Sequence, residues 1–316
     1  MTALIFLLIV ASASGQTHSV GPVAAYSKGN SVYLVSTAGE VVSTIKLPIT
    51  VGEFSFSPDL KTLVVITPHP GEAGGRMYLY SSAAGRILRI PAHALMPGSG
   101  GSEVYSDPQF SADGAELFFN THPQAKGDLY ETSGPIAELD LKTLRAKVLP
   151  WTIEVFTDDP MLSPNGRQFD LPDEEIVVGT NGTTLFDLHS FQLEEPFKWA
   201  FDEAWIGNSC VLYQAGTSAR YPLKGETAYF VLDLKTLKST GTLKILGLSN
   251  EELRGLVAYR FPYAIIKGKA DVAGTQGAAY FLVSPGGART KVALGDAAEV
   301  EVLPNDLTGD VPAGCR

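Results

Sequence analysis

Acidic side chains recur at one position relative to a repeated turn of this chain, and their types and spacing are suited to binding chemistry. Four residues before the serine of three successive turns lie Glu53, Asp107 and Asp159. The same count gives Asp202 in the next unit, and Arg254 is the counterpart in the last one. If the units form a ring, these side chains converge at its centre, where carboxylates could bind a metal ion, an amine or a basic peptide end. A structural role is the alternative, because Asp before Pro is a common turn device.

Histidine and cysteine offer two further kinds of chemistry. His69 and His122, each followed by Pro, could ligate a metal ion from neighbouring loops, although no third ligand is evident. Cys210 and Cys315 could form a disulfide that holds the C-terminal tail, or they could remain two free thiols. No nucleophile elbow, His-Glu-x-x-His, phosphate loop or dinucleotide motif occurs. The sequence therefore predicts no catalytic residue and no cofactor beyond a divalent cation.

The turns that carry the acidic positions belong to a repeat. An apolar residue enters a Ser-Pro-Asp-Gly-like turn at residues 56–61, 110–115 and 162–167. A second motif, Leu-Asp-Leu-Lys-Thr-Leu or a relative of it, recurs roughly every 50 residues, a spacing typical of propeller blades. Its copies begin at Leu34, Leu79, Leu139, Phe186, Leu232 and Leu282.

Strand patterns between these motifs define the repeating unit. Apolar residues alternate with polar ones far more often than they recur at helical spacing. Each unit contains four strands, which favours an antiparallel blade. We therefore predict an all-β fold, a six-bladed β-propeller, with residues 16–316 as one domain. The first unit lacks an inner strand, and we expect residues 298–303 to supply it, which would close the ring and remove an open edge.

The repeat resembles a known family. A Phe-Ser-Pro-Asp-Gly turn followed by a Leu-Tyr-x-Leu-Asp-Leu strand is similar to the WD-repeat-like propeller repeat of TolB-type proteins, best over residues 51–196. The resemblance is at the level of the fold. It implies a binding platform, an accessory domain or, less often, an enzyme, because one fold supports many functions.

The N-terminus and the overall charge indicate where the protein acts. Residues 1–15 combine an apolar run with small residues, which predicts a signal peptide and a secreted or periplasmic protein without a membrane span after cleavage. The net charge of −10 and pI of about 5.0 argue against a nucleic-acid partner. We expect a monomer that binds a protein or a peptide.

Three functions are consistent with these patterns. The first is an exported, non-catalytic binding or scaffold propeller that presents its channel mouth or loop face to a partner. The second is a metal-dependent hydrolase that resembles six-bladed lactonases, with Glu53, Asp107, Asp159 and Asp202 as ligands of a divalent cation. The third is carbohydrate or cell-wall binding through aromatic side chains placed ahead of the third and fourth blades, namely Tyr105, Trp151 and Phe156.

Overall fold

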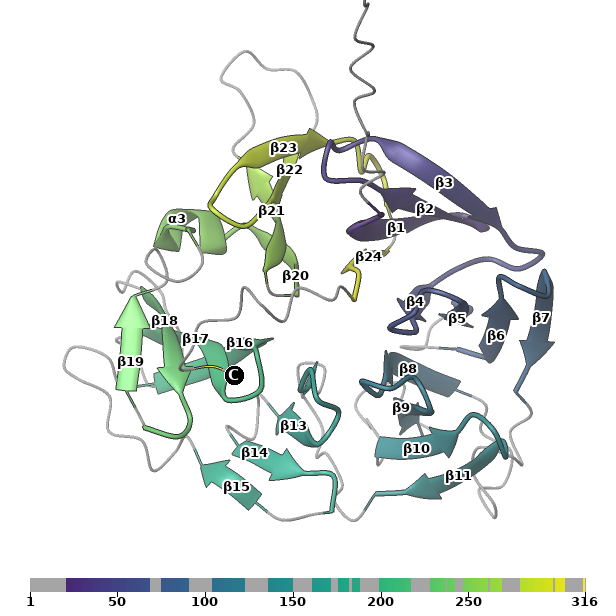
Figure 1. Ribbon diagram of the computed structural model, residues 1–316, viewed down its shortest axis with the longest axis horizontal. Coiled ribbons are helices and arrows are strands. Elements are labelled where there is room, and N and C mark those ends of the chain that lie inside the picture. Colours follow the sequence, from purple (N-terminus) through teal and green to yellow (C-terminus); the bar gives the residue numbers. More distant parts are fainter. Residues whose placement is uncertain are drawn as a thin grey trace, which may run out of the picture.

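The computed structural model describes most of the chain after residue 20. The described residues are 21–68, 75–90, 104–122, 136–149, 161–171, 176–181, 184–187, 199–216, 228–236, 238–241, 247–260, 262–268, 279–297, 299–304 and 315. The expected signal peptide lies outside them. Six four-stranded antiparallel sheets are arranged in a ring (Figure 1). We refer to the centre of this ring, between the innermost strands, as the channel. The prediction of an all-β propeller with four-stranded blades is confirmed.

Five blades, not six, are built from four consecutive strands of the chain. The first two of these are β4 (Glu53–Phe56), β5 (Thr62–Ile66), β6 (Met77–Ser81) and β7 (Arg86–Arg89), then β8 (Val104–Phe110), β9 (Glu116–His122), β10 (Ile136–Asp140) and β11 (Arg145–Val148). The next is β12 (Met161–Leu162), β13 (Gln168–Leu171), β14 (Ile176–Gly179) and β15 (Thr184–Asp187). The last two are β16 (Trp199–Ile206), β17 (Cys210–Gly216), β18 (Ala228–Asp233) and β19 (Lys238–Gly241), then β20 (Leu256–Arg260), β21 (Tyr263–Gly268), β22 (Ala279–Val283) and β23 (Arg289–Val292).

The remaining sheet is assembled from the two ends of the chain. It contains β1 (Ala24–Lys28), β2 (Ser31–Val35) and β3 (Val41–Lys46), and its innermost strand is β24 (Glu299–Val302). Strand β24 pairs antiparallel with β1, from Ala24 opposite Val302 to Ser27 opposite Glu299. Without β24, the inner edge of β1 would expose unpaired backbone groups to the channel, so the C-terminal strand closes the ring.

The Ser-Pro-Asp-Gly turns form because their side chains satisfy the backbone of the turn. Ser57 Oγ donates a hydrogen bond to Asp59 Oδ1 (2.7 Å) and accepts one from the Thr62 amide (2.9 Å). The Lys61 amide donates to the same Asp59 oxygen at 3.1 Å. The same bonds recur in the next two blades, from Ser111 to Asp113 and from Ser163 to Asn165. These polar residues therefore stabilise tight turns between the first and second strands of a blade.

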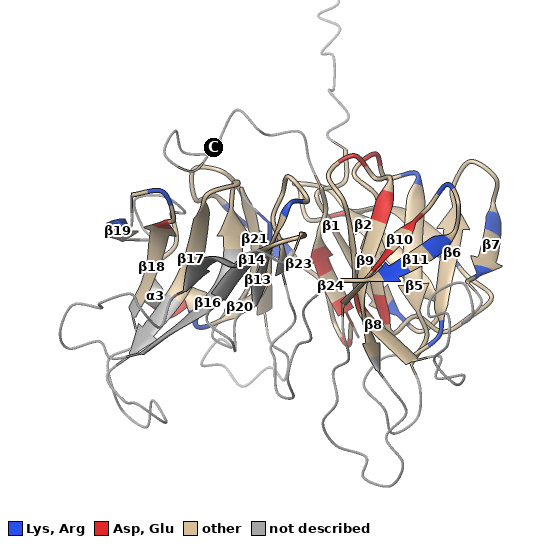
Figure 2. Ribbon diagram, turned by 90° about the horizontal axis from the view of Figure 1, so that it is seen from below, with Lys and Arg blue, Asp and Glu red and all other residues tan. Residues whose placement is uncertain are grey.

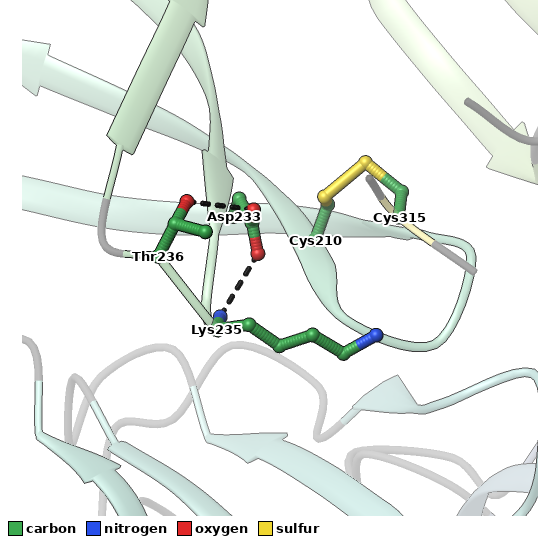
Figure 3. The surroundings of a disulfide bond; sticks show 5 residues. All are labelled: Cys210, Asp233, Lys235, Thr236 and Cys315. Atoms are coloured by element: carbon green, nitrogen blue, oxygen red, sulfur yellow. Dashed lines mark hydrogen bonds between the residues drawn. A yellow bond between two sulfur atoms is a disulfide. The ribbon is translucent and has the colours of Figure 1, made fainter. Parts of the chain in front are cut away.

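The Leu-Asp-Leu-Lys-Thr-Leu motif stabilises its turn in the same way, between the third and fourth strands of a blade. Asp140 Oδ1 accepts hydrogen bonds from the amides of Lys142 (2.9 Å) and Thr143 (2.8 Å). Asp233 accepts one from the Lys235 amide (2.9 Å) and one from Thr236 Oγ1 (2.7 Å), as Figure 3 shows. The near-identical copies of the motif thus share a structural cause, the turn between the third and fourth strands.

Adjacent blades pack face to face through apolar cores. Successive residues of β1 face opposite neighbours. Ala25 packs with Phe54 and Phe56 of the next blade, whereas Ala24 packs with Tyr263 and residues of the preceding blade. The turns also stack on one another. A Cβ atom at Gly166, which has φ of +69°, would lie 3.1 Å from the Ala112 amide nitrogen, so glycine is required there.

The inner strands line the channel and contact one another in ring order, with β20 beside β24, β24 beside β4, and β4 beside β8. A short helix, α3 (Asn250–Leu253), precedes β20. Its first turn is fixed by Ser249 and Glu252, which hydrogen-bond reciprocally as a capping box. Within the described part of the chain, no helix is long and apolar enough to cross a membrane.

Candidate functional site at the channel mouth

Two of the acidic residues singled out in the sequence meet at the channel. Glu53 is the first residue of β4, and Asp107 lies in β8 on the next blade. The backbone amide of Asp107 donates a hydrogen bond of 2.7 Å to Glu53 Oε2. The repeat therefore brings these two carboxylates together, as their shared position relative to the turn predicts.

The remaining members of the expected ring are placed differently. Asp159 lies outside the described residues, and Asp202 lies in β16 with its side chain outside the described part. Arg254 is exposed in the turn after α3, two residues before the inner strand β20 begins. The last blade has no Ser-Pro-Asp-Gly turn from which to count, and α3 occupies the segment before its inner strand. The inner-strand arginine of that blade is Arg260.

Strand β24 supplies two carboxylates that the sequence analysis missed. Glu299 and Glu301 alternate with Val300 and Val302, whose side chains pack with the core shared with the last blade. Ser55 Oγ donates a hydrogen bond of 3.2 Å to Glu301 Oε1, which connects β24 to β4 across the ring closure. The Glu-Val-Glu-Val alternation was the available signal, since acidic residues on one face of an innermost strand are unusual in a buried position.

Asp107 is held in an uncommon backbone conformation. Its φ is +53°, and the pairing of β8 with β9 shifts register between Ser106 and Gln109. Asn120 Nδ2 donates to Asp107 Oδ2 at 2.7 Å, and Ser106 Oγ donates to the same oxygen. Bulges and positive φ at non-glycine residues are concentrated where a side chain must be aimed at a site. The surrounding hydrogen bonds fix the direction of this carboxylate.

Three glutamates of the channel, Glu53, Glu299 and Glu301, have raised pKa values. Burial, reinforced by the charge of Asp107, raises the pKa of Glu53 to about 8. Burial also raises the pKa of Glu301 to about 8, although the Arg260 guanidinium and the Ser55 hydroxyl act in the opposite direction. The pKa of Glu299 is raised as well, mainly by burial. At neutral pH some of these carboxyl groups are therefore protonated and uncharged. A cation bound beside them would favour their ionised forms.

Two buried acceptor atoms near the cluster have no hydrogen-bond partner in the described structure. They are Glu301 Oε2 and Asn120 Oδ1. Burying an acceptor without a donor costs about 1–3 kcal/mol, so such atoms mark places where a ligand donor would be favourable. Both residues already hydrogen-bond to other members of the cluster through their second polar atom.

Charged residues differ between some inner and outer strands. Acidic residues lie on the inner strands β4, β8 and β24, whereas β7, at the edge of the molecule, carries basic segments (Figure 2). The outer basic residues include Arg86 and Arg89 on β7 and Arg145 and Lys147 on β11.

The metal and carbohydrate hypotheses find less support among the described residues. No group of three or more His, Cys, Asp or Glu side chains with metal-binding geometry occurs there. His69 lies outside the described residues, and the side chain of His122, at the end of β9, is not described either. Tyr105 is buried and packs edge-on against Phe119, with ring centroids 5.5 Å apart, so it is a core residue and not a sugar platform. Trp151 and Phe156 lie outside the described part.

Cys210 and Cys315 form a disulfide (Figure 3). Cys210 begins β17, directly after a turn that lacks the Ser-x-Asp pair of other blades. The Asn208 amide of that turn donates a hydrogen bond of 2.9 Å to the Cys315 carbonyl oxygen. The C-terminal tail is thus joined to this turn both by the disulfide and by a backbone hydrogen bond. This turn lies at the opposite end of the inner strands from Glu53.

Comparison with known proteins gives no family assignment. No family model matches the chain, and no curated protein matches it. The resemblance to TolB-type proteins is therefore not confirmed.

Several solved structures are similar to this chain in overall shape. An oligogalacturonate lyase in complex with manganese is 14% identical, with a TM-score of 0.49 over 83% of this chain and 70% of that one. A protein of unknown function from Desulfotomaculum acetoxidans is 11% identical, with a TM-score of 0.46 over 90% and 100%. The Swd1 β-propeller domain of Myceliophthora thermophila is 12% identical, with a TM-score of 0.40 over 68% and 67%. At such low similarity these matches carry no functional argument, and the propeller architecture rests on the strand order of this chain.

Proposed function

We propose that this protein is an exported binding propeller whose channel mouth receives a positively charged group of a protein or peptide partner. The observation that carries the proposal is the cluster of Glu53, Asp107, Glu299 and Glu301 on three adjacent inner strands, with Arg260 as the one neighbouring cation among the described residues of the cluster. Such a cluster attracts a lysine or arginine side chain, which would replace the protons that the carboxylates hold.

Export is the second part of the proposal. It is supported by the apolar N-terminal segment followed by small residues and by a disulfide that closes a separation of 105 residues. Disulfides of this kind persist in oxidising compartments. The acidic surface would keep such a protein dispersed outside the cytoplasm.

The binding proposal is testable with a short peptide that contains three lysines and with the same peptide acetylated on each lysine. Isothermal titration should detect binding of the first peptide, weakening with added salt, and little or none of the second. The Glu53→Gln/Glu299→Gln variant should lose at least about tenfold in affinity.

A matched control is Glu40→Gln/Glu251→Gln, which replaces the same number of glutamates at exposed positions. This variant should bind as the unmodified protein does. Equal losses in both variants would show that only net charge matters, and the channel proposal would then fail.

A further inference from the structure

Arg260 distinguishes this channel from a purely acidic one. It is the last residue of β20, and it is partly buried beside Glu301. A guanidinium group has five N–H donors, yet Arg260 donates no hydrogen bond to any described residue. Burial lowers the pKa of this arginine, and the charge of Glu301 opposes that effect. The group is therefore charged, withdrawn from bulk water and without the bidentate partner that arginine prefers.

The opposite charges lie at different depths along the channel. Glu53 and Glu299 begin β4 and β24, and the charge of Glu299 contributes to the raised pKa of Glu53. Glu301 lies two residues further along β24, where it faces Arg260. Two residues of an extended strand span about 7 Å. The backbone positions of Glu299 and Glu301 are thus offset by about this distance along the inner strand, and Arg260 lies beside the second of them.

We infer that the channel binds an elongated zwitterion, with its ammonium group among the mouth carboxylates Glu53, Asp107 and Glu299 and its carboxylate on Arg260. A free amino acid with a terminal amine, or the end of a short peptide, has this chemistry. The inference deepens the proposed function and rests on the same acidic mouth.

The charge pattern favours this ligand class over simpler ones. A dication would place one positive group against Arg260, and a dianion would place one negative group among the mouth carboxylates. A zwitterion pairs with both regions, and its ammonium can donate to the unpartnered Oδ1 of Asn120, whose amide nitrogen already donates to Asp107. Unlike charges that are enclosed together are stabilised, whereas like charges repel strongly in a medium of low dielectric constant.

Three six-carbon probes of equal length separate these alternatives, namely 6-aminohexanoate, 1,6-diaminohexane and hexanedioate, with glycine as a short zwitterion. Isothermal titration into the whole protein should show 6-aminohexanoate binding at least about tenfold more tightly than any other probe. Arg260→Gln should abolish this preference, and Arg260→Lys should retain part of it because a cation remains. Melting curves of both variants would establish that each is folded.

The possible results separate the inference from the proposed function. If 1,6-diaminohexane and the trilysine peptide bind but 6-aminohexanoate has no advantage, the inference is overturned and the cation-binding proposal stands. If 6-aminohexanoate binds equally well to the folded Arg260→Gln variant, the assigned role of Arg260 is overturned. If no probe binds and the trilysine peptide also fails, both proposals fall.

Discussion

The two ends of the inner strands use acidic residues in opposite ways. At the turn end, hydrogen bonds from Ser57 and the Lys61 amide lower the pKa of Asp59, and bonds from the Ala115 amide and Ser111 lower that of Asp113. At the channel mouth, burial raises the pKa of Glu53 and Glu299. The turn carboxylates are exposed and satisfied by their own blade, whereas the mouth carboxylates depend on groups from neighbouring blades.

This difference teaches how to separate structure from function in a repeat protein. A carboxylate that hydrogen-bonds within its own turn would be needed in every blade, whatever the propeller binds. A carboxylate held at an elevated pKa by burial and by a second carboxylate does not help the fold, and such groups are concentrated at functional sites. Glu53 and Asp107 occupy the same position in the repeat, but the contacts that surround them come from neighbouring blades and are not repeated.

The largest expected effect is at the turn end, where the disulfide joins the C-terminal tail to a turn. The Cys210→Ser/Cys315→Ser variant should lose about 3 kcal/mol of unfolding free energy, because the disulfide restricts the unfolded chain over a long loop. Chemical denaturation in oxidising buffer measures this loss. A change below about 1 kcal/mol would mean that the tail adds little to this turn.

A single turn serine should have the next largest effect. Ser111→Ala removes a donor to Asp113 and leaves the Glu116 amide without its hydroxyl acceptor, so unfolding free energy should fall by about 1–2 kcal/mol. Ser43→Ala, at an exposed position on β3, is the control and should change stability by less than about 0.5 kcal/mol. Binding of the trilysine peptide should be unchanged. A loss of peptide binding in Ser111→Ala would contradict the assignment of stability to the turn end and of binding to the mouth.

Neutralising a mouth carboxylate should raise the free energy of unfolding at high pH, whereas the turn substitutions lower it. Because the pKa of Glu53 is raised in the folded state to about 8, the folded protein holds a proton that the unfolded chain releases, and stability falls as pH rises from about 5 to about 8. Glu53→Gln should therefore be more stable than the unmodified protein at pH 9, by at least about 1 kcal/mol because each unit of pKa elevation corresponds to about 1.4 kcal/mol, and similar to it near pH 5. Thermal melts across this range measure the difference.

The turn carboxylate Asp113 provides the contrasting pH profile. Its pKa is lowered in the folded state, so its stabilisation is present above the unfolded pKa and is lost as pH falls through the folded one. Asp113→Asn should therefore be less stable at neutral pH and equal to the unmodified protein in acid. If the stability changes of Glu53→Gln and Asp113→Asn followed the same dependence on pH, the contrast between mouth and turn carboxylates would be contradicted.

The smallest effect is expected where a leucine occupies a glycine position. Leu60 has φ of +57° in the turn where the next blade has Gly114. Glycine would relieve about 1 kcal/mol of backbone strain, but Leu60→Gly would also lose packing of the leucine side chain against the adjacent core. The two contributions should nearly cancel, and denaturation should show a change below about 1 kcal/mol. A larger loss would indicate that packing dominates this turn.

The turns and the blade were predictable from the sequence because their causes are local. Ser57, Asp59 and Asp140 hydrogen-bond to residues a few positions away, so their spacing carries the signal. The site was only partly predictable. Asp107 and Glu53 share a repeat position, whereas Glu301 meets Ser55 and Arg260 only after the ring closes.

Long-range placement also explains why the sequence pattern did not indicate Arg260. Counting from a turn requires a turn motif, and the last blade has none between Arg260 and Tyr263. The helix before β20 then displaces the count by several residues. No periodic pattern could have indicated that an arginine at the other end of the inner strand faces the channel carboxylates.

Site-resolved carboxyl-carbon NMR over a pH titration tests the central contrast most directly. With Glu53→Gln and Asp113→Asn to assign the signals, Glu53 should titrate near pH 8 and Asp113 below its ordinary pKa. This result would establish that the mouth stores protons that a cation can displace. Titration of Glu53 at the ordinary value for glutamate, about 4.3, would contradict the account, because the mouth would then be an ordinary solvated acidic surface.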